Sequence, residues 1–323
     1  MPEIYHQKKE TNLYTIAFYN LENLFDTFDD PKIIDNEFMP TSEKKWNMKR
    51  YKKKIHNLGT AISNIGFLRS SRPPTIIGVA EAENKKVLED LINTPHLTNK
   101  EYGIIHYDSP DERGIDVALL YQKEFFEVLD SKPIEVLITN EQGVKDTTRD
   151  ILWVTGKLNG EKIHVLVNHW PSRRDGFDLT ENKRIMAAKK NREIIAEITA
   201  QDPDAKIIIM GDFNDNPRNP SVKKHLVGDD FFNPMERLHT RSSGSSSYKF
   251  AWNLFDQIIF SHNFHQYQKE KHSFAFSKVF GDDFLKIHKG RYKGTPFRTY
   301  AGKKYLGGYS DHFPVYIQLQ YNE

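Results

Sequence analysis

The sequence predicts an α/β (α+β) protein in which mixed β-sheets are covered by helices. Two observations lead to this prediction. Strand-like apolar runs recur along the whole chain, some joined by a tight turn and others by helical segments. The helical segments gather apolar residues on one face, as helices that cover a sheet do.

Nine short runs are rich in apolar and β-branched residues and are expected to be strands. In chain order they are LYTIAFYN (13–20), TIIGVAE (75–81), YGIIHY (102–107), GIDVALLY (114–121), ILWVTGKL (151–158), KIHVLVNHW (162–170), AKIIIMGDFN (205–214), FDQIIF (255–260) and FPVYIQLQ (313–320). Asn159-Gly160 between the fifth and sixth runs predicts a hairpin.

Two longer segments are predicted to be helices, from Ser42 to Ile65 and from Asp178 to Ala200. Asp178 and Glu181 have the spacing of a capping box at the start of the second helix. The polar stretch TRSSGSSSYK, Thr240 to Lys249, predicts a mobile surface loop. No internal repeat or linker divides the chain, so we expect one domain over residues 1–323, with an ordered core from about 11 to 321.

Composition excludes several classes of function. The 323 residues carry a net charge of +2 and no cysteine, which rules out disulfides, thiolate nucleophiles and Cys-ligated metal sites. No apolar run is long enough to span a membrane, and the N-terminal residues lack the apolar region of a signal peptide. We therefore expect a cytoplasmic protein, unless a signal has been removed, and a monomer.

Polar residues gather where the strand-like runs begin or end, the usual place for a functional site. They are Asn20, Glu81, Asn168, His169, Asp212, Asn214, Asp256, Asp311 and His312. Carboxylate and amide oxygens without cysteine favour a hard cation, Mg²⁺ with Mn²⁺ as a substitute. A histidine beside a carboxylate adds proton transfer and charge stabilisation. Together these groups are the equipment for hydrolysing a phosphate ester.

The motifs FYNLENLFD, RGIDVALLY, NHWPSR, MGDFND, FDQIIF and GGYSDHFPVY appear in this order. The chain thereby resembles a bacterial branch of the endonuclease/exonuclease/phosphatase superfamily, which includes deoxyribonucleases and abasic-site endonucleases. The resemblance runs from Asn20 to His312. It implies a four-layer α/β/β/α sandwich of two mixed sheets packed face to face, with helices outside and the site at one sheet edge.

The resemblance also implies roles for the residues of the site. Glu81 is similar to the principal metal ligand, with Asn20 and Asp311 near the same ion, and His312 and Asp256 resemble a His–Asp pair. His169 resembles a second histidine, Asp212 and Asn214 resemble the pair that orients the attacking water and the phosphate, and Arg149 a phosphate-contacting arginine. The general base, Asp212 or a histidine, and the number of metal ions stay open.

Further substrate contacts are expected from Arg113, Asn168 and Ser172. For Asn168 a second role, bracing the loop beneath His169, is favoured. Glu83 competes with Glu81 as a ligand, and Glu81 is favoured.

Two basic segments bear on the substrate. Lys44 to Lys54 holds seven basic residues and is read as a solvated helix face. Lys271 to Lys304 holds nine Lys or Arg with seven interleaved aromatics, which can bind nucleic acid or line a pocket for a small phosphorylated ligand.

The sequence therefore predicts a divalent-metal-dependent phosphodiesterase, a nuclease acting on DNA or RNA. The alternatives are a phosphatase or phosphodiesterase of a small phosphorylated molecule or phospholipid, and a catalytically inactive binding module.

Overall fold

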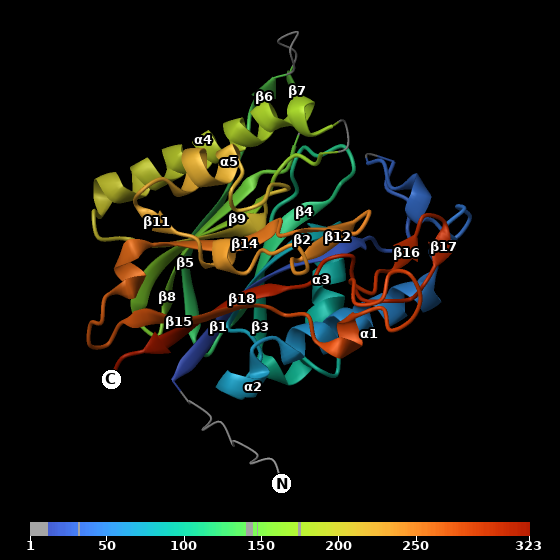
Figure 1. Cartoon of the computed structure of the whole chain (residues 1–323). Helices are drawn as coiled ribbons and strands as arrows, with labels where there is room; N and C mark the ends of the chain where they lie inside the picture. The colour runs from blue at the N-terminus through green and yellow to red at the C-terminus, as the bar shows by residue number, and fades with distance from the viewer. Residues whose placement is uncertain (1–11, 32, 140–144, 147, 174–175) are drawn as a thin grey trace.

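Two six-stranded β-sheets lie face to face between two groups of helices (Figure 1). This computed structural model describes residues 12–31, 33–139, 145–146, 148–173 and 176–323. The arrangement is the predicted four-layer α/β/β/α sandwich, and that prediction is confirmed.

The first sheet has the order β15-β18-β1-β2-β4-β3. Its strands are β1 (Leu13–Leu24), β2 (Ile76–Ala82), β3 (Tyr102–His106), β4 (Asp116–Gln122), β15 (His272–Val279) and β18 (Val315–Tyr321). β1 and β2 run parallel, whereas the other neighbours are antiparallel, so the sheet is mixed.

The second sheet has the order β11-β14-β10-β9-β8-β5. Its strands are β5 (Phe126–Ile134), β8 (Ile151–Leu158), β9 (Glu161–His169), β10 (Lys206–Asp212), β11 (Phe231–Phe232) and β14 (Asp256–Ser261). Here β9 and β10 form the parallel pair. Three short hairpins complete the strands: β6 (Ile138–Thr139) with β7 (Lys145–Asp146), β12 (Ser246–Tyr248) with β13 (Ala251–Asn253), and β16 (Tyr300–Ala301) with β17 (Lys304–Tyr305).

Helices α1 (Met48–Asn64), α2 (Phe67–Ser70) and α3 (Lys85–Ile92) cover the first sheet, and α4 (Phe177–Gln201) and α5 (Pro220–Val222) cover the second (Figure 1). Apolar side chains of Phe18 and Val315 from one sheet meet those of Val165 and Met210 from the other in a core between the sheets. Because each sheet is buried on both faces, its central strands read as continuous apolar runs. None of the helices in the described ranges is long and apolar enough to cross a membrane.

All nine predicted strands are present, and the hairpin at Asn159-Gly160 joins β8 to β9. Both turn residues have positive φ, 47° and 85°, the conformation that this dipeptide favours.

The helix starts differ from the predictions. Asn47 accepts hydrogen bonds from the backbone N–H groups of Lys49 and Arg50, so this cap begins α1 at Met48 rather than Ser42. In the second case α4 already begins at Phe177 after Gly176, so Asp178 lies inside the helix and the predicted capping box is wrong.

The prediction of a mobile surface loop from Thr240 to Lys249 is wrong for part of this stretch. Residues Ser246 to Tyr248 form β12, and Ser245 is fully buried. Ser245 accepts a hydrogen bond from the backbone N–H of Phe313 at 2.6 Å, and Ser246 forms an isolated β-bridge with His312. The serine-rich stretch therefore packs directly against the C-terminal motif.

Candidate active site

The polar residues predicted from strand ends meet at one edge of the two sheets. In the second sheet Asp212 is the register partner of both His169 on β9 and Asp256 on β14. In the first sheet Asn20 on β1 pairs with Ala80, so Glu81 follows directly beside it on β2. Strand register therefore brings together residues that are far apart in the sequence.

Two residues of this edge have unusual backbone conformations. Glu81 has φ 64° and Asn214 has φ 49°, a region that costs a non-glycine residue about 1 kcal/mol or more. At Glu81 the pairing of β2 with β4 also shifts register, as in a β-bulge. Bulges re-aim side chains, which explains how Glu81 reaches the site from the end of a buried strand.

Asp212 lies at the centre of the site. Its Oδ2 accepts a hydrogen bond from Asn20 Nδ2 at 3.0 Å, and its Oδ1 accepts one from the backbone N–H of Asn214 at 2.9 Å. Burial, and then the neighbouring carboxylate of Asp256, raise the pKa of Asp212 to about 6. Asp212 is therefore held in place and is a stronger base than an ordinary aspartate.

The amide of Asn20, predicted to lie near the metal ion, lies between two carboxylates of the site. Its Nδ2 faces Glu81 Oε1 at 3.2 Å as well as Asp212, and its Oδ1 accepts the backbone N–H of Glu22 at 2.9 Å. Because an amide NH₂ has no lone pair for a metal, this orientation makes Asn20 a donor that joins two carboxylates.

His312 and Asp256 form the predicted pair, with Nδ1 2.6 Å from Asp256 Oδ2 and 3.9 Å from Asp212 Oδ2. Burial alone lowers the pKa of His312, but Asp256, Asp212 and Asp311 outweigh it and raise that pKa well above the ordinary value. His312 is therefore a cation at neutral pH.

His169 is in the opposite electrostatic state. Its Nε2 lies 3.9 Å from Glu81 Oε1 and 4.0 Å from Asp212 Oδ2. Burial, and then the cation of Arg149, hold the pKa of His169 well below the ordinary value. The site thus contains one neutral and one charged imidazole, an arrangement that suits acid–base chemistry.

Arg149, predicted to contact a phosphate, lies between His169 and Asp111. Its Nε lies 3.2 Å from His169 Nδ1, and its Nη1 donates to Asp111 Oδ2 at 3.2 Å. Only about a tenth of its side chain is exposed. The structure therefore places Arg149 as a residue that positions His169.

Arg113 also braces the site. Its guanidinium donates to Asn23 Oδ1, and its backbone N–H donates to Asp111 Oδ1 at 3.0 Å. The backbone N–H of Asn23 in turn donates to Glu81 Oε2 at 2.7 Å. The segment after β3 thus holds Glu81 through Arg113 and His169 through Asp111.

Asp311 pairs with Arg298, whose Nη2 lies 2.7 Å from Asp311 Oδ2. Burial acts to raise the pKa of Asp311, but His312, Arg298 and Lys54 outweigh it and lower that pKa. Asp311 is therefore an ionised carboxylate beside His312, as a metal ligand must be.

Asn168 has two predicted roles, a substrate contact and the favoured brace beneath His169. It is fully buried, exchanges hydrogen bonds with Asn191 of α4, and accepts one from Trp170 Nε1 at 3.0 Å. This is the brace beneath His169 that the sequence also suggested. Ser172, by contrast, is exposed in the segment after β9, where a substrate can reach it.

Two arginines, Arg173 and Arg174, follow Ser172 in the sequence. The Nε of Arg173 donates to the Asn214 carbonyl at 2.6 Å and its Nη2 lies 2.5 Å from Asp215 Oδ1, so Arg173 holds the segment that carries Asn214. Arg174 lies outside the described residues.

Glu83 faces away from this centre. Its carboxylate accepts the backbone N–H of Asp26 at 2.6 Å, and burial raises its pKa to about 8 although that hydrogen bond acts to lower it. Glu81, whose carboxylate contacts Asn20 and approaches His169, is the better ligand candidate.

Sequence reasoning missed Lys54 and Glu22. Lys54 was read as part of a solvated face, yet it is buried, with Nζ 3.4 Å from Glu22 Oε2, 2.7 Å from Thr299 Oγ1 and 2.6 Å from the Tyr309 carbonyl. A signal was present, because Lys54 falls on the same helical stripe as the buried apolar residues at 51, 55, 58 and 62.

The donor set fits a hard divalent cation. Glu81 and Asp311 offer carboxylate oxygens, and oxygens of Asp212 and Asp256 lie within 4.8 Å of each other and of a His312 ring nitrogen. Hard cations take one or two carboxylates and keep the remaining positions for water and phosphate oxygens. A site of this kind suits the metal-assisted hydrolysis of a phosphate ester.

Comparison with known proteins identifies the family. A family model described as Endonuclease/Exonuclease/phosphatase family matches residues 15–321, so the chain belongs to this family of metal-dependent phosphoester hydrolases. No curated protein matches significantly.

Solved structures share the fold. An endonuclease/exonuclease/phosphatase family protein of Bacteroides thetaiotaomicron has TM-score 0.60 and 17% identity, with 98% of this chain and 97% of that chain covered. A mannosyl-6-phosphatase of the same organism has TM-score 0.59 and 16% identity, covering 95% and 100%. TDP2 of D. rerio complexed with a single-strand DNA product has TM-score 0.57 and 14% identity, covering 95% and 99%.

Proposed function

We propose that this protein hydrolyses phosphodiester bonds of a nucleic acid with the help of a divalent cation, Mg²⁺ or in its place Mn²⁺. The observation that supports the chemistry is the pair of His312 and Asp256, 2.6 Å apart, beside an Asp212 whose pKa is raised to about 6. The pair supplies a stable cation, and Asp212 supplies a base.

Glu81 and Asp311 would hold the cation, which would polarise the phosphoryl oxygen and offset its negative charge when bound. Asp212, held in place by hydrogen bonds from Asn20 and Asn214, orients the attacking water and accepts its proton. His312, kept charged by Asp256, donates a hydrogen bond where negative charge develops on the phosphoryl group. As the water oxygen bonds to phosphorus, the ester P–O bond breaks and the leaving oxygen takes up a proton from solvent. The neutral ring of His169 lies beside Glu81 and Asp212 and adds no positive charge there.

Aromatic and basic groups around the β12–β13 hairpin, whose Ser246 forms a β-bridge with His312, support a nucleic acid as substrate. Phe250, at the tip of the β12–β13 hairpin, stacks on Tyr292 with ring centroids 5.3 Å apart, and the guanidinium of Arg291 lies 4.6 Å from its ring. Both rings are about half exposed. Exposed aromatic rings with neighbouring cations are typical of surfaces on which bases stack.

A cavity of about 630 Å³ lies at the same hairpin, and its lining includes Arg218, His239, Arg241 and Trp252. Trp252 stacks on Phe313, which directly follows His312. A cavity with two arginines so close to the reacting centre suits a second phosphate of the same chain.

One observation favours a second candidate, a phosphatase of a small phosphorylated molecule. Asp111, which contacts Arg149 in the site, also lines a cavity in which most lining residues are acidic. A long polyanion avoids such a flank, whereas a small monoester need not cross it.

The deciding experiment compares hydrolysis of a chromogenic phosphodiester, a chromogenic phosphomonoester and single-stranded and double-stranded oligonucleotides. Each is measured with Mg²⁺, Mn²⁺ or chelator, with Asp212→Ala as the control. Metal-dependent cleavage of the diester and an oligonucleotide supports the proposal. Turnover of the monoester alone favours the second candidate, and no turnover of any substrate contradicts both.

A further inference from the structure

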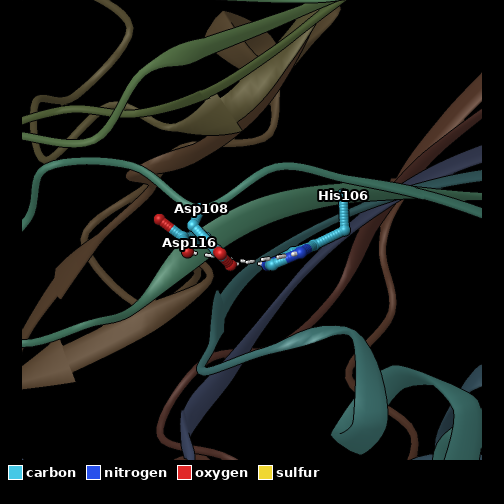
Figure 2. A group of neighbouring side chains, drawn as sticks. All are labelled: His106, Asp108 and Asp116. Carbon is cyan, nitrogen blue, oxygen red and sulfur yellow. Dashed lines mark ion pairs between the residues drawn. The ribbon is translucent and has the colours of Figure 1, made fainter.

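A second group of possible metal ligands lies outside the catalytic centre. Figure 2 shows His106, Asp108 and Asp116 with their side chains pointing toward one another. His106 ends β3, Asp116 begins β4, and Asp108 lies in the segment between them. One ligand atom from each residue lies within 4.8 Å of the others, close enough to share one ion.

One nitrogen of the His106 imidazole is buried without a hydrogen-bond partner among the described residues. The side chain of His106 is 3% exposed, and this nitrogen is its Nε2. Asp116 Oδ2 is 3.5 Å from this nitrogen, and Asp108 Oδ1 is 3.9 Å from Nδ1. A buried polar atom without a hydrogen-bond partner destabilises the folded protein. A metal ion bound to this nitrogen would remove that cost.

Asp116 is fixed in a way that leaves one oxygen available. Its Oδ1 accepts hydrogen bonds from the backbone N–H of Ser109 at 3.1 Å and from the Ser109 hydroxyl. The other oxygen, Oδ2, is the one that faces His106. A carboxylate anchored at one oxygen and open at the other is preorganised as a ligand.

The group opens onto a strongly acidic cavity of about 550 Å³. Its lining includes the carboxylates of Asp26, Asp29, Asp30, Glu83, Asp108, Asp111, Glu112 and Asp116, and no Lys or Arg among the residues that the structure describes. So many carboxylates in one cavity create a field that attracts cations and provides a route for an ion from solvent.

We propose that His106, Asp108 and Asp116 bind a divalent transition-metal ion, Mn²⁺ or Zn²⁺, distinct from the catalytic cation. One imidazole nitrogen and two carboxylate oxygens suit these ions better than Mg²⁺, which prefers oxygen ligands alone. Water molecules fill the remaining positions.

The ion would tie together the two ends of the segment between β3 and β4. That segment carries Asp111, which contacts Arg149, and Arg113, which contacts Asn23. Through these contacts it supports His169 and Glu81, so this ion is a positioning element for the catalytic centre.

The test counts bound Mn²⁺ by electron paramagnetic resonance in excess Mg²⁺, in a Glu81→Gln background that weakens the catalytic site. Asp108→Asn is the main variant, because its side chain is 91% exposed and its loss does not disturb packing. Asp283→Asn, with a side chain 90% exposed, is the matched control. His106→Gln is a second variant, in which the Mn²⁺ signal should lose its coupling to an imidazole nitrogen.

We expect the parent to bind one Mn²⁺ ion. Its affinity should fall at least tenfold in Asp108→Asn and in His106→Gln and stay unchanged in Asp283→Asn. Zn²⁺ should displace the bound Mn²⁺. Equal binding in all four proteins, or no Mn²⁺ bound in the parent, overturns the inference. Neither result depends on turnover, so this site and the proposed function fail or succeed separately.

Discussion

The guanidinium of Arg149 lies flat enough against the ring of His169 to reach both nitrogens, with Nε 3.2 Å from Nδ1 and Nη2 2.9 Å from Nε2. Arginine can only donate, and a neutral imidazole has one acceptor nitrogen, so one contact at a time is a hydrogen bond. A protonated His169 would have no acceptor and would face a cation. Arg149 therefore selects the neutral ring.

Replacing Arg149 by methionine should raise the pKa of His169, because it removes the largest charge that lowers it. We expect turnover to fall about 10- to 100-fold, as for other groups that orient a catalytic side chain. Titration of the His169 resonance by NMR, with Lys157→Met on β8 as the control, checks this. An unmoved His169 titration would show that burial alone sets its pKa.

Lys54→Met should destabilise the protein by about 3–5 kcal/mol, because it leaves the buried carboxylate of Glu22 without its cation. Lys53→Met, one position earlier on the exposed face of α1, should change stability by about 0.5 kcal/mol or less. Urea unfolding of both variants measures the difference. Similar losses of stability in the two variants would mean that Thr299 and solvent can stabilise the Glu22 carboxylate without Lys54.

Much of the fold was predictable because the central strands are buried on both faces and read as apolar runs. The missed strands β5 and β15 lie at sheet edges, where polar residues alternate with apolar ones and Pro133 or a bulge near Phe274 interrupts the pattern. The order of the motifs along the chain, each at a strand end, and the family that they resemble led to the residues that gather at this site.

The contacts around that centre could not be predicted. Whether Arg149 points to a phosphate or to His169 depends on Asp111, which is 38 positions away and has no sequence signal. The orientation of the Asn20 amide depends on the backbone of Glu22 in a left-handed conformation at φ 53°. Such choices follow from tertiary contacts rather than from local sequence pattern.

Asp256→Asn should lower turnover about 10²- to 10⁴-fold, the usual contribution of a positioned acid–base group. The change removes the carboxylate that keeps His312 charged, so the pKa of His312 should fall, and that of Asp212 should fall as well because Asp256 repels its charge. The pH dependence of turnover and NMR titration of His312 test both shifts. The exposed change Asp229→Asn should leave both profiles as they are.

Glu161→Gln should remove a contribution to the free energy of unfolding that depends on pH. Glu161 on β9 is 2.9 Å from Lys206 Nζ on β10 and 2.7 Å from His272 Nδ1 on β15, so this buried carboxylate joins the two sheets. Burial acts to raise the pKa of Glu161, but His272 and Lys206 outweigh it and lower that pKa below 4.5.

A carboxylate with a lowered folded-state pKa stabilises the protein above its unfolded pKa and loses that contribution as pH falls through the folded value. At pH 7 we therefore expect Glu161→Gln to cost about 3–5 kcal/mol. Below about pH 4.5 the difference from the parent should begin to shrink, because the unfolded carboxylate becomes protonated there, and it should be lost as the pH falls through the lower folded-state pKa. Urea unfolding from pH 3 to pH 8, with the exposed change Glu197→Gln as the control, measures this. A difference that stayed constant across that range would mean that Glu161 acts through packing rather than through its charge.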